Sequence, residues 1–132
     1  MKAFTIRPAR PDEAGIILDL IKQLAVYERC ENDVVADEAT LRQSLFEERS
    51  AEVVLAEEDL FVIPEKRGLG YGKALLRYVA KLAVARNCGR MEWICLDWNE
   101  PSLRIYRFIG AVPMSEWTVQ RLDEQALKAF AK

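Results

Sequence analysis

A glycine loop between an apolar run and a helical pattern limits the possible folds of this chain more than any other part of the sequence. The loop is Arg67–Gly68–Leu69–Gly70–Tyr71–Gly72, and the apolar run before it covers 60–63. From about Gly70 to Asn87, apolar residues recur at the spacing of an amphipathic helix. A buried strand that leads through glycines into a helix is typical of α/β domains, in which helices pack on a sheet.

The rest of the chain continues this alternation of strands and helices. Alternating or β-branched runs predict strands at 4–8, 53–56, 91–97 and 117–122. Helical spacing and start signals predict helices at 11–28, from near Asp37, at 99–109 and close to the C-terminal end. With 132 residues and a hydrophobic content of 51%, the chain 1–132 is predicted to form a single α/β domain with helices on a mixed sheet.

Composition excludes several classes of protein. A net charge of −2 gives no general attraction to nucleic acid or to an anionic membrane. No run approaches the roughly 18 apolar residues of a membrane span, and the first residues lack the apolar region of a signal peptide, so a cytoplasmic location is expected.

The chain also lacks the residues of the common metal and disulfide sites. Cys30, Cys88 and Cys95 show no C-x-x-C spacing, and there is no histidine. Neither a disulfide framework nor a bound metal is therefore expected. Without histidine, proton transfer has to use a carboxylate, a tyrosine, a cysteine or water.

The glycine loop suits a bound phosphate, because N–H groups without neighbouring side chains can converge on an anion where a helix begins. Seven Lys or Arg residues and no acid lie between Lys66 and Arg90, which leaves 12 basic against 21 acidic residues elsewhere. A tight turn that requires positive φ is the alternative explanation of the glycines.

Two common phosphate loops fit this sequence poorly. Ala74 stands where a P-loop has the Ser or Thr that holds magnesium. The third glycine comes one residue too early for the dinucleotide fingerprint, so an NAD site is a weak alternative. A metal-free diphosphate held by amides and flanking cations is what coenzyme A would require.

A polar stripe marks the helix expected at 99–109. Asn99, Ser102 and Tyr106 are spaced i, i+3 and i+7, so they share one face. Asn99 is placed to cap this helix, and Pro101 lies in its first turn. A phenol at the end of a polar stripe suits a reacting site, and a core aromatic with a satisfied hydroxyl is an equally good explanation.

Together these motifs resemble the GNAT superfamily of acetyl-CoA-dependent N-acetyltransferases. The glycine loop after residues 59–62 is similar to the acyl-CoA signature R/Q-x-x-G-x-G/A, and N-x-x-S-x-x-x-Y before Gly110–Ala111 is similar to the segment with the catalytic tyrosine. The resemblance implies a mostly antiparallel twisted sheet with helices on both faces, and Tyr106 as the acid that protonates the departing thiolate. The residues that it assigns to acetyl-CoA are Leu60, Phe61, Val62, Arg67, Gly68, Leu69, Gly70, Tyr71, Gly72, Lys73, Asn99, Pro101 and Ser102.

The N-terminal part narrows the resemblance. Ile6–Arg7–Pro8–Ala9 and Tyr27–Glu28 are similar to segments of the diamine and polyamine acetyltransferases, which include the spermidine/spermine and thialysine enzymes. The resemblance implies a small primary amine as substrate, and Glu58 is expected to accept its proton through a water. The residues assigned to the amine are Tyr27, Glu28, Glu58, Glu92, Trp93 and Ile94. The segment 30–33 departs from the family pattern, which leaves the preferred amine open.

Two other functions stay open at this point. One is a protein, peptide or other amine N-acetyltransferase that uses the same cofactor site, and the other is an acyl-CoA-binding module without catalysis. Related acetyltransferases commonly pair through their C-terminal strands, so the resemblance also implies a homodimer, with Trp117 and Val119 as apolar interface residues.

The connection between the runs 53–56 and 60–63 is unusual. It consists of Glu57–Glu58–Asp59, three adjacent acids, whereas tight hairpins need residues such as Gly or Asn that accept positive φ. GNAT domains normally carry a further long strand in this interval. The sequence therefore predicts that about 15 to 30 residues, roughly two strand lengths, are missing between Ala56 and Asp59 by disorder or by deletion. Whether Glu58 lies before or after that gap stays open.

Overall fold

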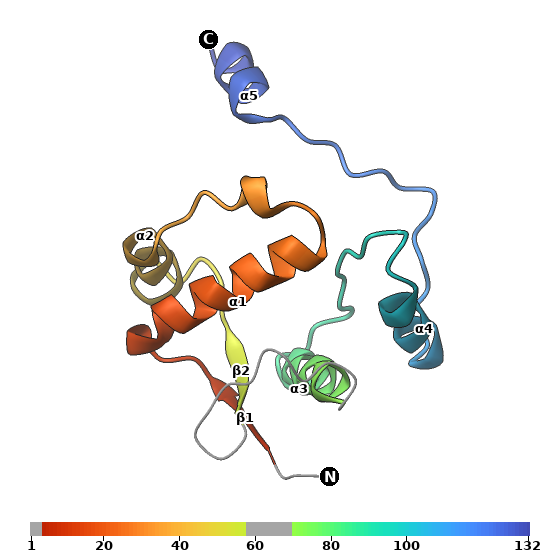
Figure 1. The fold of residues 1–132 in the computed structure, drawn as a ribbon. Coiled ribbons are helices and arrows are strands. Elements are labelled where there is room, and N and C mark those ends of the chain that lie inside the picture. Colours follow the sequence, from red (N-terminus) through yellow and green to blue (C-terminus); the bar gives the residue numbers. More distant parts are fainter. Residues whose placement is uncertain (1–3, 58–69) are drawn as a thin grey trace. The chain divides into compact units, whose positions relative to one another are not determined.

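The computed structural model describes residues 4–57 and 70–132 (Figure 1). The chain divides into two compact units, Met1–Leu96 and Asp97–Lys132. No helix of these described residues is long and apolar enough to cross a membrane.

Among the described residues of the first unit, the sheet is an antiparallel pair of strands, β1 (Thr5–Pro8) and β2 (Val54–Glu57). Thr5 lies opposite Glu57, and Pro8 lies opposite Val54. The N–H of Ala9 continues the ladder by donating to the carbonyl of Val53 at 2.8 Å. Both strands were expected from their apolar runs.

The buried core of the first unit is formed mainly by one face of α1 (Ala14–Tyr27), which follows the 3₁₀ turn η1 (Pro11–Glu13). Helical spacing puts several apolar residues of α1 on the same face, where they are buried away from water. The buried apolar residues of the described chain are Ala14, Ile17, Leu18 and Ala25 of α1 together with Leu55 of β2.

Two short helical segments follow a second 3₁₀ turn, η2 (Glu31–Asp33). They are α2 (Glu38–Arg42) and the π-helical η3 (Gln43–Glu47). Asp37 caps α2 by accepting the N–H of Thr40 at 2.7 Å, so the helix begins where the sequence predicted. The helix α2 contacts α1.

The helix α3 (Tyr71–Ala85) begins after the glycine loop and contacts β2. Its C-terminal end is joined to the segment before β2 by the ion pair of Arg86 with Glu52. The predicted helix from Gly70 to Asn87 is thereby confirmed within two residues at each end.

The second unit contains α4 (Glu100–Phe108) and α5 (Glu124–Phe130). Gly110 adopts a φ of +88°, which ends α4 as the sequence predicted. The N–H of Ala111 then donates to the carbonyl of Tyr106 at 2.9 Å. Asp123 caps α5 by accepting the N–H of Ala126 at 2.8 Å.

The predictions of strands at 91–97 and 117–122 are wrong, because neither segment is a strand in the structure. β-Branched and aromatic residues favour extended chain, but a strand also needs a neighbour that completes its hydrogen-bond ladder. Within the described part of the chain, that ladder joins only β1 and β2. The strand expected at 60–63 lies outside the described residues.

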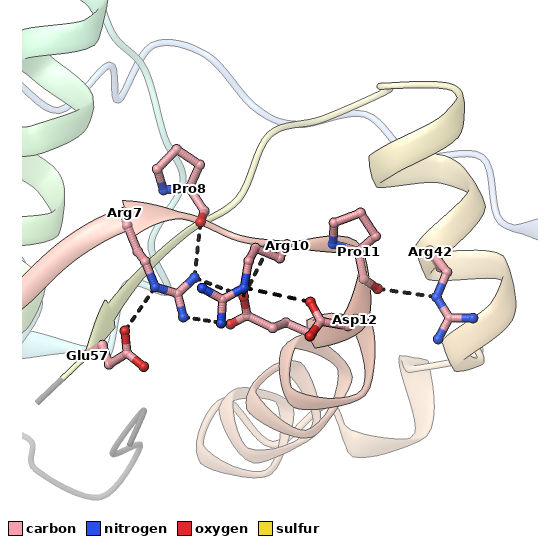
Figure 2. A network of polar contacts seen from close by, with 8 residues as sticks. Arg7, Pro8, Arg10, Pro11, Asp12, Arg42 and Glu57 are labelled. Carbon is pink, nitrogen blue, oxygen red and sulfur yellow. Dashed lines mark hydrogen bonds and ion pairs between the residues drawn. The ribbon is translucent and has the colours of Figure 1, made fainter. Parts of the chain in front are cut away.

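A charged network ties β1, η1 and β2 together (Figure 2). Two guanidinium nitrogens of Arg7 donate to the carboxylate of Glu13 at 2.8 and 2.9 Å, and its Nε donates to Glu57 at 2.9 Å. The side chains of Arg7, Glu13 and Glu57 are only 19%, 5% and 22% exposed. The hydrogen bonds from Arg7 lower the pKa values of the Glu13 and Glu57 carboxyl groups below their ordinary values, and this effect outweighs burial, which would raise them. Arg10 adds a further ion pair to Glu13 at 3.0 Å.

The network predicts a loss of stability in acid. The pKa of Glu13 is lower in the folded state than in the unfolded chain. The ionised carboxylate therefore contributes fully to the free energy of unfolding above the ordinary glutamate pKa of about 4.3. This contribution is lost as the pH falls through the lower pKa of the folded state. Glu13→Gln should destabilise the protein by about 1–3 kcal/mol at pH 7 and should flatten the acid limb of the stability curve. Urea unfolding followed by circular dichroism from pH 7 to pH 3 measures both effects. Glu124→Gln, which changes an exposed carboxylate, is the control. If Glu13→Gln left the loss of stability between pH 7 and pH 3 unchanged, the stabilising role of Glu13 would be contradicted.

Candidate functional site

The first turn of α3 is where the sequence predicts a bound phosphate. Gly70 precedes the helix with a φ of +86°, a conformation that L-residues with a side chain rarely adopt. Intrahelical bonding begins with the N–H of Ala74, which donates to the carbonyl of Gly70 at 3.0 Å. The N–H groups of Tyr71, Gly72 and Lys73 lie in the first turn of the helix, and N–H groups at this position of a helix bind side chains, water or ligands. Such a turn is a general binding site for phosphate.

The packing of the described residues does not explain why position 72 is a glycine. Gly72 has an ordinary negative φ within α3, and a Cβ added there would meet none of their atoms within 4 Å. Glycine in a helix costs about 0.5–1 kcal/mol relative to alanine. The absence of a side chain leaves the backbone of this turn open to close approach, which is what a diphosphate requires. These residues therefore fit the diphosphate of coenzyme A.

The charge of α3 supports the same conclusion. The helix contains basic residues and no acidic residue. Lys73, Arg77 and Lys81 are spaced by four residues, so they lie along one face that starts at the glycine turn. Arg86, one turn further on, forms the ion pair with Glu52. The positive charge therefore continues from the glycine turn along the helix.

The predicted reacting end lies on α4. Ser102 and Tyr106 are half-buried, while Glu100, Arg104 and Arg107 are exposed, so the polar stripe is on the more protected side of the helix. Arg107 forms an ion pair with Glu100 within the same helix. The Tyr106 side chain thus comes from the face of α4 that Ser102 shares, as the spacing predicted.

Asn99 occupies the N-cap position of α4, as predicted, although its side chain makes no capping hydrogen bond. The residue is buried, with an exposed fraction of 6%. Among the described residues, only Glu13 and Asn99 are both polar or charged and buried. An amide kept from solvent at the start of the helix is compatible with the predicted role beside the cofactor.

The residues predicted to contact the amine lie in two places in the first unit. Tyr27 is the last residue of α1, and the half-buried Glu28 follows it as the C-cap. Glu92 is exposed and forms an ion pair with Arg90 at 3.2 Å. The guanidinium group of Arg90 therefore lies beside the carboxylate that was predicted to bind the cationic amine. Trp93 and Ile94 are both exposed, with Ile94 at 82%.

Some of the predicted site residues lie outside the described residues, namely Glu58, Leu60, Phe61, Val62, Arg67, Gly68 and Leu69. The others fall into groups at the end of α1, at the start of α3, at 92–94 and on α4, and α4 belongs to the second unit. A shallow hollow of about 490 Å³ at α5 is lined by Asp123, Glu124, Gln125 and Lys128, none of which was predicted.

One contact of the glycine turn was not predicted from the sequence. The ring of Phe4 meets the ring of Tyr71 with centroids 4.6 Å apart. Phe4 was assigned to a strand and Tyr71 to the loop, and a contact between residues so distant in sequence leaves no local pattern. Only the structure could reveal it.

The Acetyltransferase (GNAT) family model matches residues 21–111, which is more than half of the chain. The chain belongs to this family. It is therefore an acetyl-CoA-dependent N-acetyltransferase, and the glycine turn of α3 and the helix α4 both lie in the matched region.

Several acetyltransferases are similar to this chain in sequence. The thialysine N-epsilon-acetyltransferase of Mus musculus is 27% identical over 168 aligned positions, which cover 99% of both chains. The bovine enzyme of the same name is 28% identical over 96% of both chains. The L-ornithine N5-acetyltransferase of Arabidopsis thaliana is 44% identical over 75 residues, which are 57% of this chain and 33% of the plant protein.

Solved structures confirm the GNAT fold. An integron cassette protein from the mobile metagenome of V. cholerae superposes with a TM-score of 0.76 at 23% identity, over 100% of this chain and 99% of that one. A predicted acetyltransferase of Clostridium acetobutylicum, crystallised with acetyl-CoA, gives a TM-score of 0.70 at 16% identity over 91% and 97% of the two chains.

Gly72 allows a sharp test of the phosphate turn. Gly72→Ala should raise the unfolding free energy by about 0.5–1 kcal/mol, because alanine is the better helix residue and meets no described atom. The same change should weaken coenzyme A binding roughly tenfold, which corresponds to about 1.4 kcal/mol, because the methyl group occupies the approach to the backbone. Urea unfolding and isothermal titration calorimetry measure the two effects. Gly89→Ala is the matched control, and unchanged affinity in Gly72→Ala would refute this role.

Proposed function

We propose that the protein transfers the acetyl group of acetyl-CoA to a primary amine of a small diamine-like or polyamine-like substrate by direct attack. The observation that carries the proposal is the open glycine turn of α3, which fits the diphosphate of the cofactor. The names of the similar enzymes, which act on thialysine and ornithine, support a small amine as the acceptor.

The proposed cofactor residues are those that the resemblance to the family assigns. The N–H groups of the turn Gly70–Lys73 bind the diphosphate in this proposal, and Asn99, Pro101 and Ser102 are assigned to the cofactor by the resemblance alone. By resemblance to the family, Leu60, Phe61 and Val62 bind the pantetheine arm, and Arg67, Gly68 and Leu69 complete the loop. The burial of Asn99 supports its part in this arrangement.

The proposed amine site uses carboxylates, because the free substrate is cationic. An alkyl amine has a pKa near 10.4 and is almost wholly protonated at neutral pH, so it has to lose a proton before it attacks. Tyr27, Glu28, Glu92, Trp93 and Ile94 contact the substrate in this scheme, and Glu58 accepts the proton through a water. The neutral nitrogen then bonds to the thioester carbonyl carbon, and the carbon–sulfur bond breaks.

Tyr106 completes the proposed reaction by donating its phenolic proton to the departing sulfur. Its half-buried position beside Ser102 on α4 supports this role. The attacking nitrogen passes its second proton to water as the amide forms, Glu58 returns its proton to solvent, and the phenolate regains a proton from solvent after coenzyme A leaves. Proton and electron counts therefore balance over one turnover. The chain contains no histidine that could take the same part.

The role of Tyr106 predicts a separation of binding from turnover. Tyr106→Phe should lower kcat by about a hundredfold or more, the usual contribution of a general acid, with little change in the affinity for acetyl-CoA. Steady-state thiol release and calorimetry test this together. Tyr78→Phe, at a tyrosine of α3, is the matched control; full turnover in Tyr106→Phe would remove the general-acid role.

A screen of acceptors tests the substrate class. Coenzyme A release should be fastest with thialysine, ornithine or related diamines and polyamines, because their second cationic group can be recognised by carboxylates. Faster acetylation of peptides would instead favour a protein N-acetyltransferase. Tight binding of acetyl-CoA without release by any amine would favour a binding module.

We also propose that a sheet segment is missing between Ala56 and Asp59. The mouse enzyme aligns over 168 positions with a chain of 132 residues, so at least 36 positions have no counterpart here, which is more than the roughly 15 to 30 residues expected from the sequence. A shortened chain of this kind supports a deletion rather than a disordered loop. The proposal fails if those unmatched positions fall elsewhere in the alignment.

A homodimer is proposed from the C-terminal segment. Trp117 and Val119 are 76% and 71% exposed, and large apolar side chains of this kind gain free energy when a second copy covers them. Light scattering at micromolar concentration should give twice the mass of one chain, and Trp117→Glu should lower it. A monomeric wild-type protein would contradict this proposal.

A further inference from the structure

Phe4 makes an aromatic contact with the first residue of α3. The rings of Phe4 and Tyr71 have centroids 4.6 Å apart and planes at 81°, a T-shaped arrangement. In this geometry the positive edge of one ring meets the negative face of the other, which adds to the burial of apolar surface. The contact joins the residue before β1 to the turn proposed to hold the diphosphate.

The position of Tyr71 makes this contact important for the turn. Tyr71 lies between Gly70 and Gly72, so it is the only residue of the segment 70–72 that has a side chain. Glycines give the backbone on both sides unusual freedom, and that freedom has to be lost when the N–H groups align on an anion. An anchored Tyr71 ring restricts the turn before the ligand arrives.

The anchor itself belongs to a restrained part of the fold. Phe4 directly precedes β1, which pairs with β2, and β2 contacts α3. Arg7, three residues after Phe4, is held by Glu13 and Glu57. The Phe4 ring is therefore attached to a strand whose place is fixed by backbone and ionic contacts, and it can transmit that restraint to Tyr71.

We propose that Phe4 is a positioning residue for the diphosphate-binding turn and acts through Tyr71. The inference rests on the proposed function, because it concerns the same cofactor site. Phe4 has no part in the proposed transfer step, so its loss should affect the affinity for coenzyme A and leave kcat and the KM for the amine almost unchanged.

The first experiment compares variants by calorimetry with coenzyme A. Phe4→Leu, which keeps apolar volume and removes the ring, should bind about three- to tenfold more weakly. Phe4→Tyr, which keeps the ring, should bind like the wild type. Phe130→Leu, at an aromatic residue 83% exposed on α5, is the matched control and should also bind like the wild type.

A double-mutant cycle with Tyr71→Leu shows whether the effect passes through Tyr71. The two changes should be non-additive in the dissociation constant of coenzyme A, and Phe4→Leu should shift the phosphorus NMR signals of the bound diphosphate. Additive effects, unchanged affinity, or a fall in kcat at constant affinity would each overturn the inference. A wild-type protein that does not bind coenzyme A would instead refute the proposed function itself.

Discussion

The bidentate contact between Arg7 and Glu13 holds together the part of the fold on which the proposed cofactor site depends. Arg7 lies on β1, Glu13 in the turn before α1, and Glu57, its second partner, at the end of β2. Removing one member of a buried pair leaves the other charge without compensation, so the three residues act as a unit. Because α3 contacts β2 and Tyr71 contacts Phe4, the start of α3 is linked to the same two strands.

The two glycines at the start of α3 have different explanations, one structural and one functional. Gly70 is required by its left-handed backbone, and any residue with a side chain would be strained there. Gly72 has no such requirement within the described residues, and alanine would stabilise the helix more. A residue that lowers stability without a structural reason is best explained by a ligand that approaches the backbone. The aromatic pair of Tyr71 and Phe4 offsets part of the freedom that the two glycines introduce.

Local signals in the sequence predicted the main helices and both strands of the described sheet, but they also predicted two strands that the structure does not contain. The cap at Asp37, the helical spacing of α1 and α3, and Gly110 after α4 each act within a few residues, so they can be read directly. The expected strands at 91–97 and 117–122 failed because an extended segment becomes a strand only beside a suitable partner. Likewise, the stripe of Ser102 and Tyr106 followed from helix geometry, whereas burial of Asn99 and the Phe4–Tyr71 contact depend on tertiary structure.

Binding of coenzyme A fragments tests the central claim most directly, namely that the start of α3 recognises a diphosphate. Calorimetry should show that coenzyme A and 3′-dephospho-coenzyme A both bind, whereas pantetheine, which has the thiol arm and no diphosphate, binds at least about a hundredfold more weakly, a difference of about 2.7 kcal/mol. The affinity of coenzyme A should also fall as the salt concentration rises, because the site is basic. Equal affinities for pantetheine and coenzyme A would contradict this account.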